Sequence, residues 1–547
     1  MLFPQVKKLE KYGEYSFDGA VSVSLCESDI EYEKLFDTVF GGISSPEGKL
    51  VISCKKAAAE PTHGQEEYSL VISEKGGKVF SEVSAYYEEG IMRGLQTIKR
   101  MLLKNEFILG NINDYPSFKV RGYIEGFYGK PWKARERLEM LSLMALFGEN
   151  THYYAPKDDP YHRDKWREPY PEKKAAELKR LIDKAKSLYV ELYYCIAPGL
   201  SMKYSSDEEL QALFDKTRQL FSMGIKNFGL LLDDIPSDLF YEEDKKRYGN
   251  AVRAHIELIG KYFSFLKSLS PECRLTVCPT AYHGKGDERE LTGLTGNIPS
   301  EVSVFYTGSD ICSKEITRAE AEYFEKNNNR QPLYWDNYPV NDAEMFMEMH
   351  IGPVIGRDKE LYKSCEGIIS NCMEYFNCNK FSLITLAAYM WSPEDYEPER
   401  AFSEAVSFML PENEREAFVL LADQFRTSCL HDENSRIMGE YLSAASVRLS
   451  TGNYESALEI LTEYTDKINS AAVSLSEKSS PLYKELSRWI KKFILMSDIL
   501  TLALSVIKGE DKKAGLKRKM RKYNESATVL TAFCFREYIE SVLDYEN

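Results

Sequence analysis

The feature that most restricts the fold of this chain is a strand–loop–helix pattern that repeats between residues 118 and 400. Short apolar runs typical of buried parallel strands alternate with segments of 3.6-residue apolar periodicity, such as the stripe Leu138, Leu141, Met144 and Ala145. The eight strand candidates are residues 119–125, 151–155, 190–197, 228–233, 275–279, 302–307, 332–337 and 367–371. Eight strand–helix units of this length predict a (β/α)8 TIM barrel, although an open doubly wound sheet has the same local pattern.

The segments on either side of this repeat differ from it and from each other. Residues 1–116 mix short alternating strands with one helix near residues 90–103, which predicts a small accessory α/β domain before the barrel of residues 117–400. After residue 400 the strand signals stop, and a 3.6-residue period runs from Leu482 to Leu504. We therefore expect residues 401–547 to form a C-terminal α-helical bundle, in a chain that is α/β as a whole.

Composition and charge exclude several classes of partner. The 547 residues are 43% hydrophobic and 28% charged, as in soluble globular proteins. A formal net charge of −15 argues against nucleic acid as the main partner, because phosphate binding needs a cationic surface. The basic cluster of residues 512–522 is better explained as a solvated helix face than as a site for an anionic partner. Since no apolar stretch approaches the roughly 20 residues that span a bilayer, we expect no membrane segment.

The N-terminus and the cysteines bear on location. The first ten residues lack the charged-then-apolar pattern of a secretory signal, which predicts a cytoplasmic protein, although a secreted protein with its signal removed would look the same. The eleven cysteines include no CxxC pair, and the seven histidines are scattered. Buried thiols in a reducing compartment fit this pattern better than disulfides or a metal site.

The strongest chemical signal is the aspartate pair Asp233 and Asp234, which follows the apolar run 228–232. The carboxyl ends of parallel strands are where α/β folds build their active sites. Adjacent side chains on an ideal strand point to opposite faces, so both carboxylates reach one pocket only where the strand ends and twists. Adjacent like charges disfavour joint ionisation, so one acid can keep its proton near neutral pH. This is suited to acid/base chemistry, although a solvated strand end or a helix N-cap would also explain two aspartates.

The other strand ends share one chemical character. Asp, Asn and Lys occur there beside Trp and Tyr in residues 125–132, 155–162, 278–284 and 335–337 and at Asn371. Polar groups of this kind bind sugar hydroxyls, and aromatic faces pack against the apolar C–H face of the ring. No phosphate-binding glycine loop is present, because Gly-Phe-Tyr-Gly at 126–129 matches neither a P-loop nor GxGxxG. The strand ends together predict a carbohydrate site.

In these segments the chain resembles glycoside hydrolase family 84, which contains the O-GlcNAcases and bacterial β-N-acetylglucosaminidases. The resemblance rests on RGYIEGFYGKPW (121–132), APKDDPYHRDKWREPY (155–170), LLLDDI (230–235), CPTAYHG (278–284), YWDNYPVND (334–342) and Asn371. It covers roughly residues 1–400, because GIMRGLQTIKRML also resembles the last helix of the accessory domain in bacterial members. The chain departs from the family pattern at Ala281, where many members carry glutamate. This difference leaves the chemistry unchanged but affects which aglycone we expect the protein to prefer.

The resemblance implies a retaining exo-β-N-acetylglucosaminidase that works by substrate assistance. In this scheme the 2-acetamido oxygen of the substrate attacks the anomeric carbon and forms an oxazoline, so no enzyme nucleophile is needed. Asp233 would bind and orient the acetamido N–H, and Asp234 would be the general acid and later the general base. Tyr282 would help to polarise the acetamide. No metal and no cofactor is implied.

The family motifs also assign the rest of the sugar pocket. Trp335 would enclose the acetyl methyl group, and Asn337 would hydrogen-bond the acetamido group. The positions that would hold the ring hydroxyls are Gly126, through its backbone, Lys157, Asp342 and Asn371. Glu125 and the second acidic pair, Asp158 and Asp159, are interpreted as structural supports, and a Schiff-base role for Lys157 is the less favoured alternative because nothing marks it as desolvated beside another cation.

The expected partner is a glycan that contains N-acetylglucosamine or a protein modified with O-GlcNAc, and a homodimer through the C-terminal helices is a further possibility. A hyaluronidase-like endo-enzyme and an inactive carbohydrate-binding scaffold are the alternatives. The first would need a cationic surface for a polyanion, and the second would be expected to have lost Asp233, Asp234 or Tyr282.

Overall fold

A computed structural model of the protein describes residues 2–26, 30–430, 433–530 and 533–544. The chain divides into two compact units. The first comprises Met1–Asn337, Val354–Cys372 and Leu383–Ala401, and the second comprises Tyr338–Pro353, Met373–Ser382 and Phe402–Asn547. The domain boundaries at 116/117 and 400/401 stay predictions.

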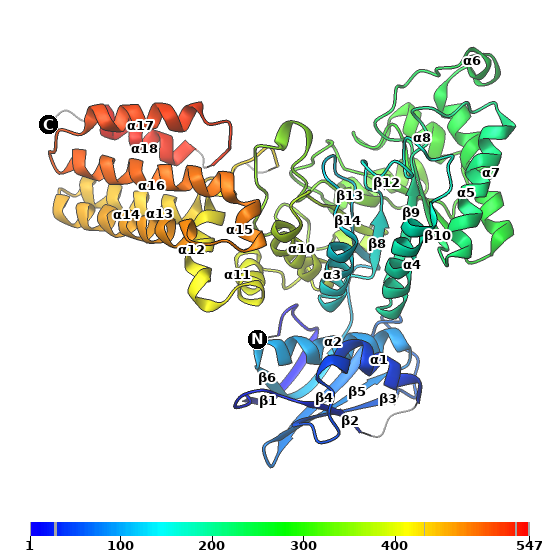
Figure 1. Ribbon diagram of the computed structural model, residues 1–547, viewed down its shortest axis with the longest axis horizontal. Helices are drawn as coiled ribbons and strands as arrows, with labels where there is room; N and C mark the ends of the chain where they lie inside the picture. Colours follow the sequence, from blue (N-terminus) through cyan, green and yellow to red (C-terminus); the bar gives the residue numbers. More distant parts are fainter. Residues whose placement is uncertain (1, 27–29, 431–432, 531–532, 545–547) are drawn as a thin grey trace. The chain divides into compact units, whose positions relative to one another are not determined.

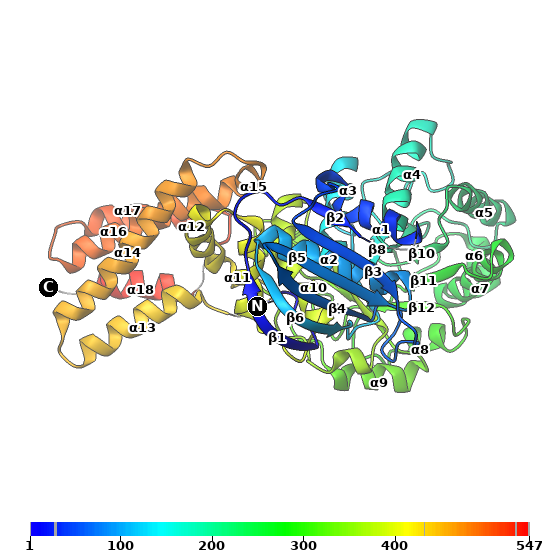
Figure 2. The same cartoon turned by 90° about the horizontal axis from the view of Figure 1, so that it is seen from below.

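The N-terminal part of the first unit is a six-stranded sheet with two helices (Figure 1). Its strands are β1 (Lys8–Tyr15), β2 (Val23–Leu25), β3 (Leu50–Lys56), β4 (Tyr68–Lys75), β5 (Lys78–Ala85) and β6 (Phe107–Asp114), and its helices are α1 (Ile30–Phe40) and α2 (Glu88–Lys104). The strand order is β1-β6-β4-β5-β3-β2, and Figure 2 shows these strands side by side. Because α2 packs on β4, β5 and β6, its apolar residues Ile91, Leu95 and Ile98 are fully buried. The predicted accessory α/β domain is confirmed.

The larger part of the first unit is a closed barrel of eight parallel strands in the order β10-β11-β12-β13-β14-β7-β8-β9. The strands are β7 (Val120–Ile124), β8 (Thr151–Tyr154), β9 (Glu191–Ile196), β10 (Asn227–Leu231), β11 (Arg274–Cys278), β12 (Ser303–Tyr306), β13 (Leu333–Asp336) and β14 (Gly367–Asn371). All eight predicted strands are present, and closure decides for the TIM barrel over the open sheet. Bulky side chains such as Tyr153, Phe305 and Trp335 fill the interior.

Helices follow the barrel strands, as the 3.6-residue periodicity predicts. They are α3 (Ala134–Leu146), α4 (Glu172–Ser187), α5 (Asp207–Ser222), α6 (Glu242–Tyr248), α7 (Ala251–Leu269), α8 (Arg289–Thr295), α9 (Arg318–Asn328) and α10 (Phe376–Trp391). The predicted stripe of α3 is largely correct, because Leu141, Met144 and Ala145 are buried. The helices thereby cover the barrel wall and leave the loops after the strands to build the site.

An ion cluster joins the N-terminal sheet domain to the amino ends of the barrel strands. Glu66 Oε1 accepts hydrogen bonds from Arg93 Nε at 2.7 Å and Arg121 Nη2 at 2.6 Å. Glu66 Oε2 accepts one from Asn150 Nδ2 at 3.2 Å. Although burial opposes ionisation, the two arginines hold the pKa of Glu66 at about 2. Both oxygens of this carboxylate therefore have hydrogen-bond partners, and we interpret the cluster as a structural link between the sheet domain and the barrel.

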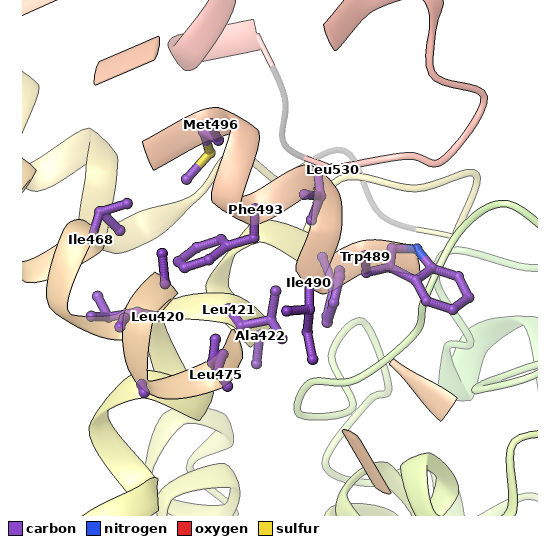
Figure 3. Close-up of a cluster of buried hydrophobic side chains, with 14 of the residues drawn as sticks. Leu420, Leu421, Ala422, Ile468, Leu475, Trp489, Ile490, Phe493, Met496 and Leu530 are labelled. Atoms are coloured by element: carbon purple, nitrogen blue, oxygen red, sulfur yellow. The ribbon is translucent and has the colours of Figure 1, made fainter. Parts of the chain in front are cut away.

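The second unit is a helical bundle, which confirms the predicted C-terminal helices. From Phe402 on, it contains most of α11 (Pro398–Met409) and the helices α12 (Glu412–Ala422), α13 (Arg436–Ser450), α14 (Tyr454–Ser476), α15 (Pro481–Glu485), α16 (Ser487–Ile507), α17 (Lys513–Glu525) and α18 (Phe533–Asp544). Figure 3 shows Trp489, Ile490 and Phe493 of α16 packed with residues of α12 and α14 in the core of the bundle. The apolar stripe from Leu482 to Leu504 is buried, as its period predicts. This stripe spans two helices, because Leu486 separates α15 from α16.

Two further observations concern the surface and the thiols. The basic residues of α17, such as Lys517, Arg518 and Lys522, are exposed, as expected of a solvated helix face. Seven of the eleven cysteines are buried, and no disulfide links any two cysteines in the part of the chain that the structure describes. No helix within the same described ranges is long and apolar enough to cross a bilayer.

Candidate active site

The aspartate pair lies just beyond the end of β10, which stops at Leu231 rather than at the predicted residue 233. Leu232 N still donates to Cys278 O at 2.9 Å, but Asp234 then adopts a left-handed backbone with φ of 52°. This conformation is uncommon for a residue with a side chain, although aspartate tolerates it better than most. It ends the strand alternation, so Lys157 Nζ lies 2.7 Å from Asp233 Oδ2 and 3.7 Å from Asp234 Oδ2. Both carboxylates thus reach one lysine.

Asp233 and Lys157 form a buried ion pair. Their side chains are only 8% and 4% exposed. Burial lowers the pKa of Lys157, but the Asp233 carboxylate outweighs this effect and the pKa lies above its ordinary value. The lysine is therefore a cation, which removes the basis for a Schiff-base role. Asp233 Oδ1 is buried and has no hydrogen-bond partner among the described residues, so one acceptor oxygen stays open.

Asp234 has a different environment from its neighbour, because 36% of its side chain is exposed. Its Oδ2 accepts a hydrogen bond from the Tyr128 hydroxyl at 2.8 Å, and its Oδ1 accepts one from the Tyr282 hydroxyl at 3.2 Å. Burial, with the Asp234 carboxylate adding to it, raises the pKa of Tyr282 well above the ordinary value for a phenol. Tyr282 is therefore a hydrogen-bond donor at any working pH.

A second cluster forms where β13, β14 and the loop after β7 meet. Asn337 Oδ1 accepts hydrogen bonds from Trp335 Nε1 at 2.9 Å and Asn371 Nδ2 at 3.0 Å. Asn371 Oδ1 is buried without a partner among the described residues. A Cβ atom on Gly126 would lie 2.7 Å from the Trp335 ring and 3.0 Å from Asn371 Oδ1, so only glycine lets the loop backbone come this close.

The two clusters adjoin the same group of apolar side chains, because Trp335, Leu231 and Cys278 belong to it and Tyr282 packs against it. Of the predicted site residues, eight are thereby gathered at the carboxyl end of the barrel: Asp233, Asp234, Tyr282, Gly126, Lys157, Trp335, Asn337 and Asn371. The ninth, Asp342, precedes the short 3-10 helix η2 (Ala343–Met345) and belongs to the second unit. Its place in the sugar pocket stays a prediction.

Of the residues interpreted as structural supports, Glu125 and Asp159 have partners that fit this interpretation, whereas Asp158 is exposed. Glu125 is fully buried, and its two oxygens accept hydrogen bonds from Arg137 Nε at 2.6 Å and Nη2 at 2.7 Å. Asp159 Oδ2 accepts hydrogen bonds from the hydroxyls of Tyr154 at 2.8 Å and Tyr170 at 2.6 Å. These carboxylates have little capacity left for a ligand. Within the described ranges, no group of three or more His, Cys, Asp and Glu side chains is placed to hold a metal ion.

Tyr128 is the site residue that sequence reasoning missed. It lies in the loop of residues 126–129, it is 39% exposed, and it contacts Asp234 directly. Its hydroxyl also accepts a hydrogen bond from Arg163 Nη1 at 3.2 Å. In the motif of residues 121–132, Phe127 and Tyr128 are adjacent. The hydroxyl of Tyr128 is the one signal that could have identified it as a partner of an acid.

The chain is similar to known proteins in sequence and in fold. Residues 121–423 match the family model described as β-N-acetylglucosaminidase. The protein O-GlcNAcases of Rattus norvegicus and Mus musculus are each 32% identical over 274 residues, which is 49% of this chain and 29% of each relative. The chain therefore matches less than a third of the length of these curated relatives.

Solved structures extend the comparison. A mutant of the Thermobaculum terrenum O-GlcNAc hydrolase is 33% identical with a TM-score of 0.73, and the match covers 78% of this chain and 95% of that chain. A structure described as CpGH84B is 23% identical with a TM-score of 0.85, and it covers 99% of this chain and 100% of its own. The second likeness bears on the fold alone, and it extends over the C-terminal helices.

Proposed function

Because the chain belongs to the β-N-acetylglucosaminidases of glycoside hydrolase family 84, we propose that it is a retaining exo-enzyme that removes terminal β-linked N-acetylglucosamine by substrate assistance. The proposed substrates are O-GlcNAc on serine or threonine of proteins and terminal N-acetylglucosamine of glycans. The similarity to proteins described as O-GlcNAcase and O-GlcNAc hydrolase supports the first of these classes.

The observation that carries the proposal is the unequal environment of the two adjacent aspartates. Asp233 is buried, one of its oxygens is held by Lys157, and the other has no partner among the described residues. An open, buried carboxylate oxygen is suited to accept the acetamido N–H of the substrate. This hydrogen bond would orient the acetamido oxygen toward the anomeric carbon and stabilise the positive charge that develops as the oxazoline ring closes.

Asp234 would move the proton in both steps. In the first, the acetamido oxygen bonds to the anomeric carbon, the glycosidic C–O bond breaks, and Asp234 gives its proton to the leaving oxygen. In the second, Asp234 takes a proton from water, which attacks the anomeric carbon and opens the oxazoline. Two inversions give net retention. Its greater exposure suits this role, because the leaving group and the attacking water must both reach it.

The remaining residues would hold the sugar. Tyr282 would turn its hydroxyl from Asp234 to the acetamido oxygen when substrate binds, since the present 3.2 Å contact is long for a hydrogen bond between a hydroxyl and a carboxylate. Trp335 would enclose the acetyl methyl, and Asn337 would bond the acetamido group. The ring hydroxyls would be held by Gly126 through its backbone, Lys157, Asp342 and Asn371.

The test is turnover of aryl β-N-acetylglucosaminides with good and poor leaving groups by the wild type, Asp233→Ala and Asp234→Ala. Asp233→Ala should lose on the order of 10²–10³ in kcat on both substrates, because the closing oxazoline loses its charge partner. Asp234→Ala should lose a similar factor on the poor leaving group and much less on the good one. Equal losses for Asp234→Ala on both substrates would refute its role as the acid. A folded wild type that is inert on every such glycoside would refute the proposal as a whole.

A further inference from the structure

A cavity of about 510 Å³ is lined in part by the two loops that carry Asp234 and Tyr282. Ser237, three residues after Asp234, lines it from the β10 loop, and Pro279–Ala281, which end just before Tyr282, line it from the β11 loop. Thr280 ties these loops together, because its hydroxyl donates to Leu232 O at 2.8 Å. The volume of the cavity is typical of ligand pockets. Asp234 is the proposed proton donor to the leaving oxygen, and the same loop that carries it lines this cavity through Ser237.

The charges that line the cavity favour an anion. Arg253, in the first turn of α7, and Arg289, at the start of α8, both line it, and neither side chain has a hydrogen bond or ion pair with any described residue. Glu290 is the one acidic residue of the lining. His255 also lines the cavity, and burial lowers its pKa to about 4, so it is neutral at pH 7. Two arginines and one glutamate give a local charge of 2 − 1 = +1 in a chain of net charge −15.

The uncharged residues that line the cavity indicate which class of anion would fit. Its floor includes Val252, Ile256 and Leu294, and its lining contains no Phe, Tyr or Trp. A sugar ring would therefore find no aromatic face to pack on, in contrast to the candidate site that contains Trp335. An extended peptide needs no such face. The methylene groups of an acidic side chain can pack against these apolar residues while its carboxylate reaches a guanidinium.

We propose that this cavity is an aglycone subsite, in which Arg253 and Arg289 bind an acidic side chain of the glycosylated peptide, close in sequence to the modified serine or threonine. This inference rests on the proposed function, because it requires that the sugar of such a peptide occupies the Asp233–Asp234 site. Ala281 contributes to the subsite by its size, since its methyl group leaves open the space that the glutamate expected from the family resemblance would fill with a like charge.

The experiment compares two O-GlcNAc peptides that differ only in charge, one with Asp and Glu flanking the modified serine and one with Asn and Gln in their place. Wild type should prefer the acidic peptide in kcat/KM by about tenfold, as expected of one or two charge-assisted hydrogen bonds at a solvated site. Arg253→Ala and Arg289→Ala should each reduce this preference, and the double variant should abolish it. The preference should also fall with added salt.

Two controls separate this inference from the proposed function. Hydrolysis of 4-nitrophenyl β-N-acetylglucosaminide, whose leaving group has no acidic side chain, should be unchanged in all arginine variants, which also reports that they fold. Arg180→Ala is the matched control for loss of one cation, because Arg180 is exposed on α4 and has no ion pair with any described residue. It should leave the peptide preference intact.

The outcomes are distinct. If wild type hydrolyses the aryl glycoside but treats the two peptides alike, or if the double variant keeps the preference, the subsite is refuted while the proposed function stands. If the arginines instead govern cleavage next to a uronic acid in an oligosaccharide and leave the peptides unaffected, the occupant is a polyanionic glycan and the proposal is likewise refuted. If wild type is inert on the aryl glycoside, the proposed function itself fails.

Discussion

Two ends of the same barrel bury carboxylates in different ways. At the carboxyl end, Asp233 pairs with Lys157 yet keeps one buried oxygen without a partner among the described residues. At the amino end, Glu66 is bonded through both oxygens to Arg93, Arg121 and Asn150. In TIM barrels the first end generally carries catalysis and the second stability. The two carboxylates differ in that Asp233 has an acceptor oxygen without a partner in the described part of the chain, to which a substrate N–H can donate. The Glu66 ion pair has no such open oxygen.

Glu149 shows that a spare oxygen alone does not make a site. It lies at the amino end, just before β8, and both of its oxygens are buried with no hydrogen-bond partner among the described residues. Burial raises the pKa of Glu149 to about 8, with Arg121 opposing the shift only in part. It is therefore a neutral acid at pH 7. What distinguishes Asp233 is a lysine in direct contact, at 2.7 Å, that pairs with the carboxylate.

The largest effect is expected from Lys157→Met, which removes that lysine without removing either aspartate. Asp233 would lose its ion-pair partner in a buried setting, which is strongly unfavourable, and would no longer be held in position to stabilise positive charge. We expect kcat/KM on an aryl glycoside to fall by about 10³-fold, as for loss of one strong transition-state contact. Thermal unfolding of the same sample checks that the protein is folded, and activity within tenfold of wild type would show that the lysine is not what distinguishes the two ends.

The converse change is Arg121→Met at the amino end. It leaves the buried Glu66 with a single arginine partner, which is expected to cost about 3 kcal/mol of unfolding free energy. Because Arg121 does not contact the aspartate pair, kcat/KM should be unchanged at temperatures where the variant is folded. Chemical denaturation and kinetics on the same preparation test both parts. A loss of activity without a loss of stability would mean that the two ends are coupled.

Sequence alone predicted the architecture well because its strongest signals are periodic. The eight strands and the buried stripe from Leu482 to Leu504 follow from apolar spacing, which packing must respect. The ends of elements were less predictable. The residues of β10 read as strand through Asp233, but the chain leaves the strand after Leu231 and reaches positive φ at Asp234. An Asp-Asp dipeptide does not indicate where the strand ends, because aspartate is compatible with both the extended and the left-handed conformation.

Contacts made by loop residues were predictable only where a motif marked them. The family motif assigns Gly126 to the sugar pocket through its backbone, and the structure places Gly126 beside the Trp335 ring, although contact with a sugar stays a prediction. Tyr128 was not singled out, because side-chain alternation does not apply in a loop and Phe127 and Tyr128 are equally good candidates to face inward. Glu149 precedes Asn150 and a strand, where a glutamate is usually solvated, and its burial depends on tertiary packing, in which Arg93 of the sheet domain donates a hydrogen bond to its backbone carbonyl.

Glu149→Gln tests the neutral acid at the amino end through pH. The raised pKa means that the folded state binds this proton more tightly than the unfolded state does, so wild-type stability falls as pH rises from about 4.5 to about 8. Glutamine does not titrate. The stability of the variant relative to wild type should therefore increase by about 1.4 kcal/mol per pH unit across this window and level off outside it. Denaturation at pH 4, 6 and 8 measures it, and a constant difference would show that Glu149 is ionised in the folded protein.

Tyr128→Phe is expected to have the smallest effect, and it asks whether the partners of Asp234 at the carboxyl end are functional. The variant removes the hydroxyl that donates to Asp234 Oδ2 at 2.8 Å and keeps the ring that packs over Lys157 and Arg163. Loss of one solvated hydrogen bond to a carboxylate should lower kcat by about fivefold, or about 1 kcal/mol. If Tyr128 positions the proton donor, the loss will be confined to poor leaving groups and KM will be unchanged. An equal loss on good and poor leaving groups would instead mean that Tyr128 acts on the shape of the loop, and that Asp233 alone depends on a precisely placed partner.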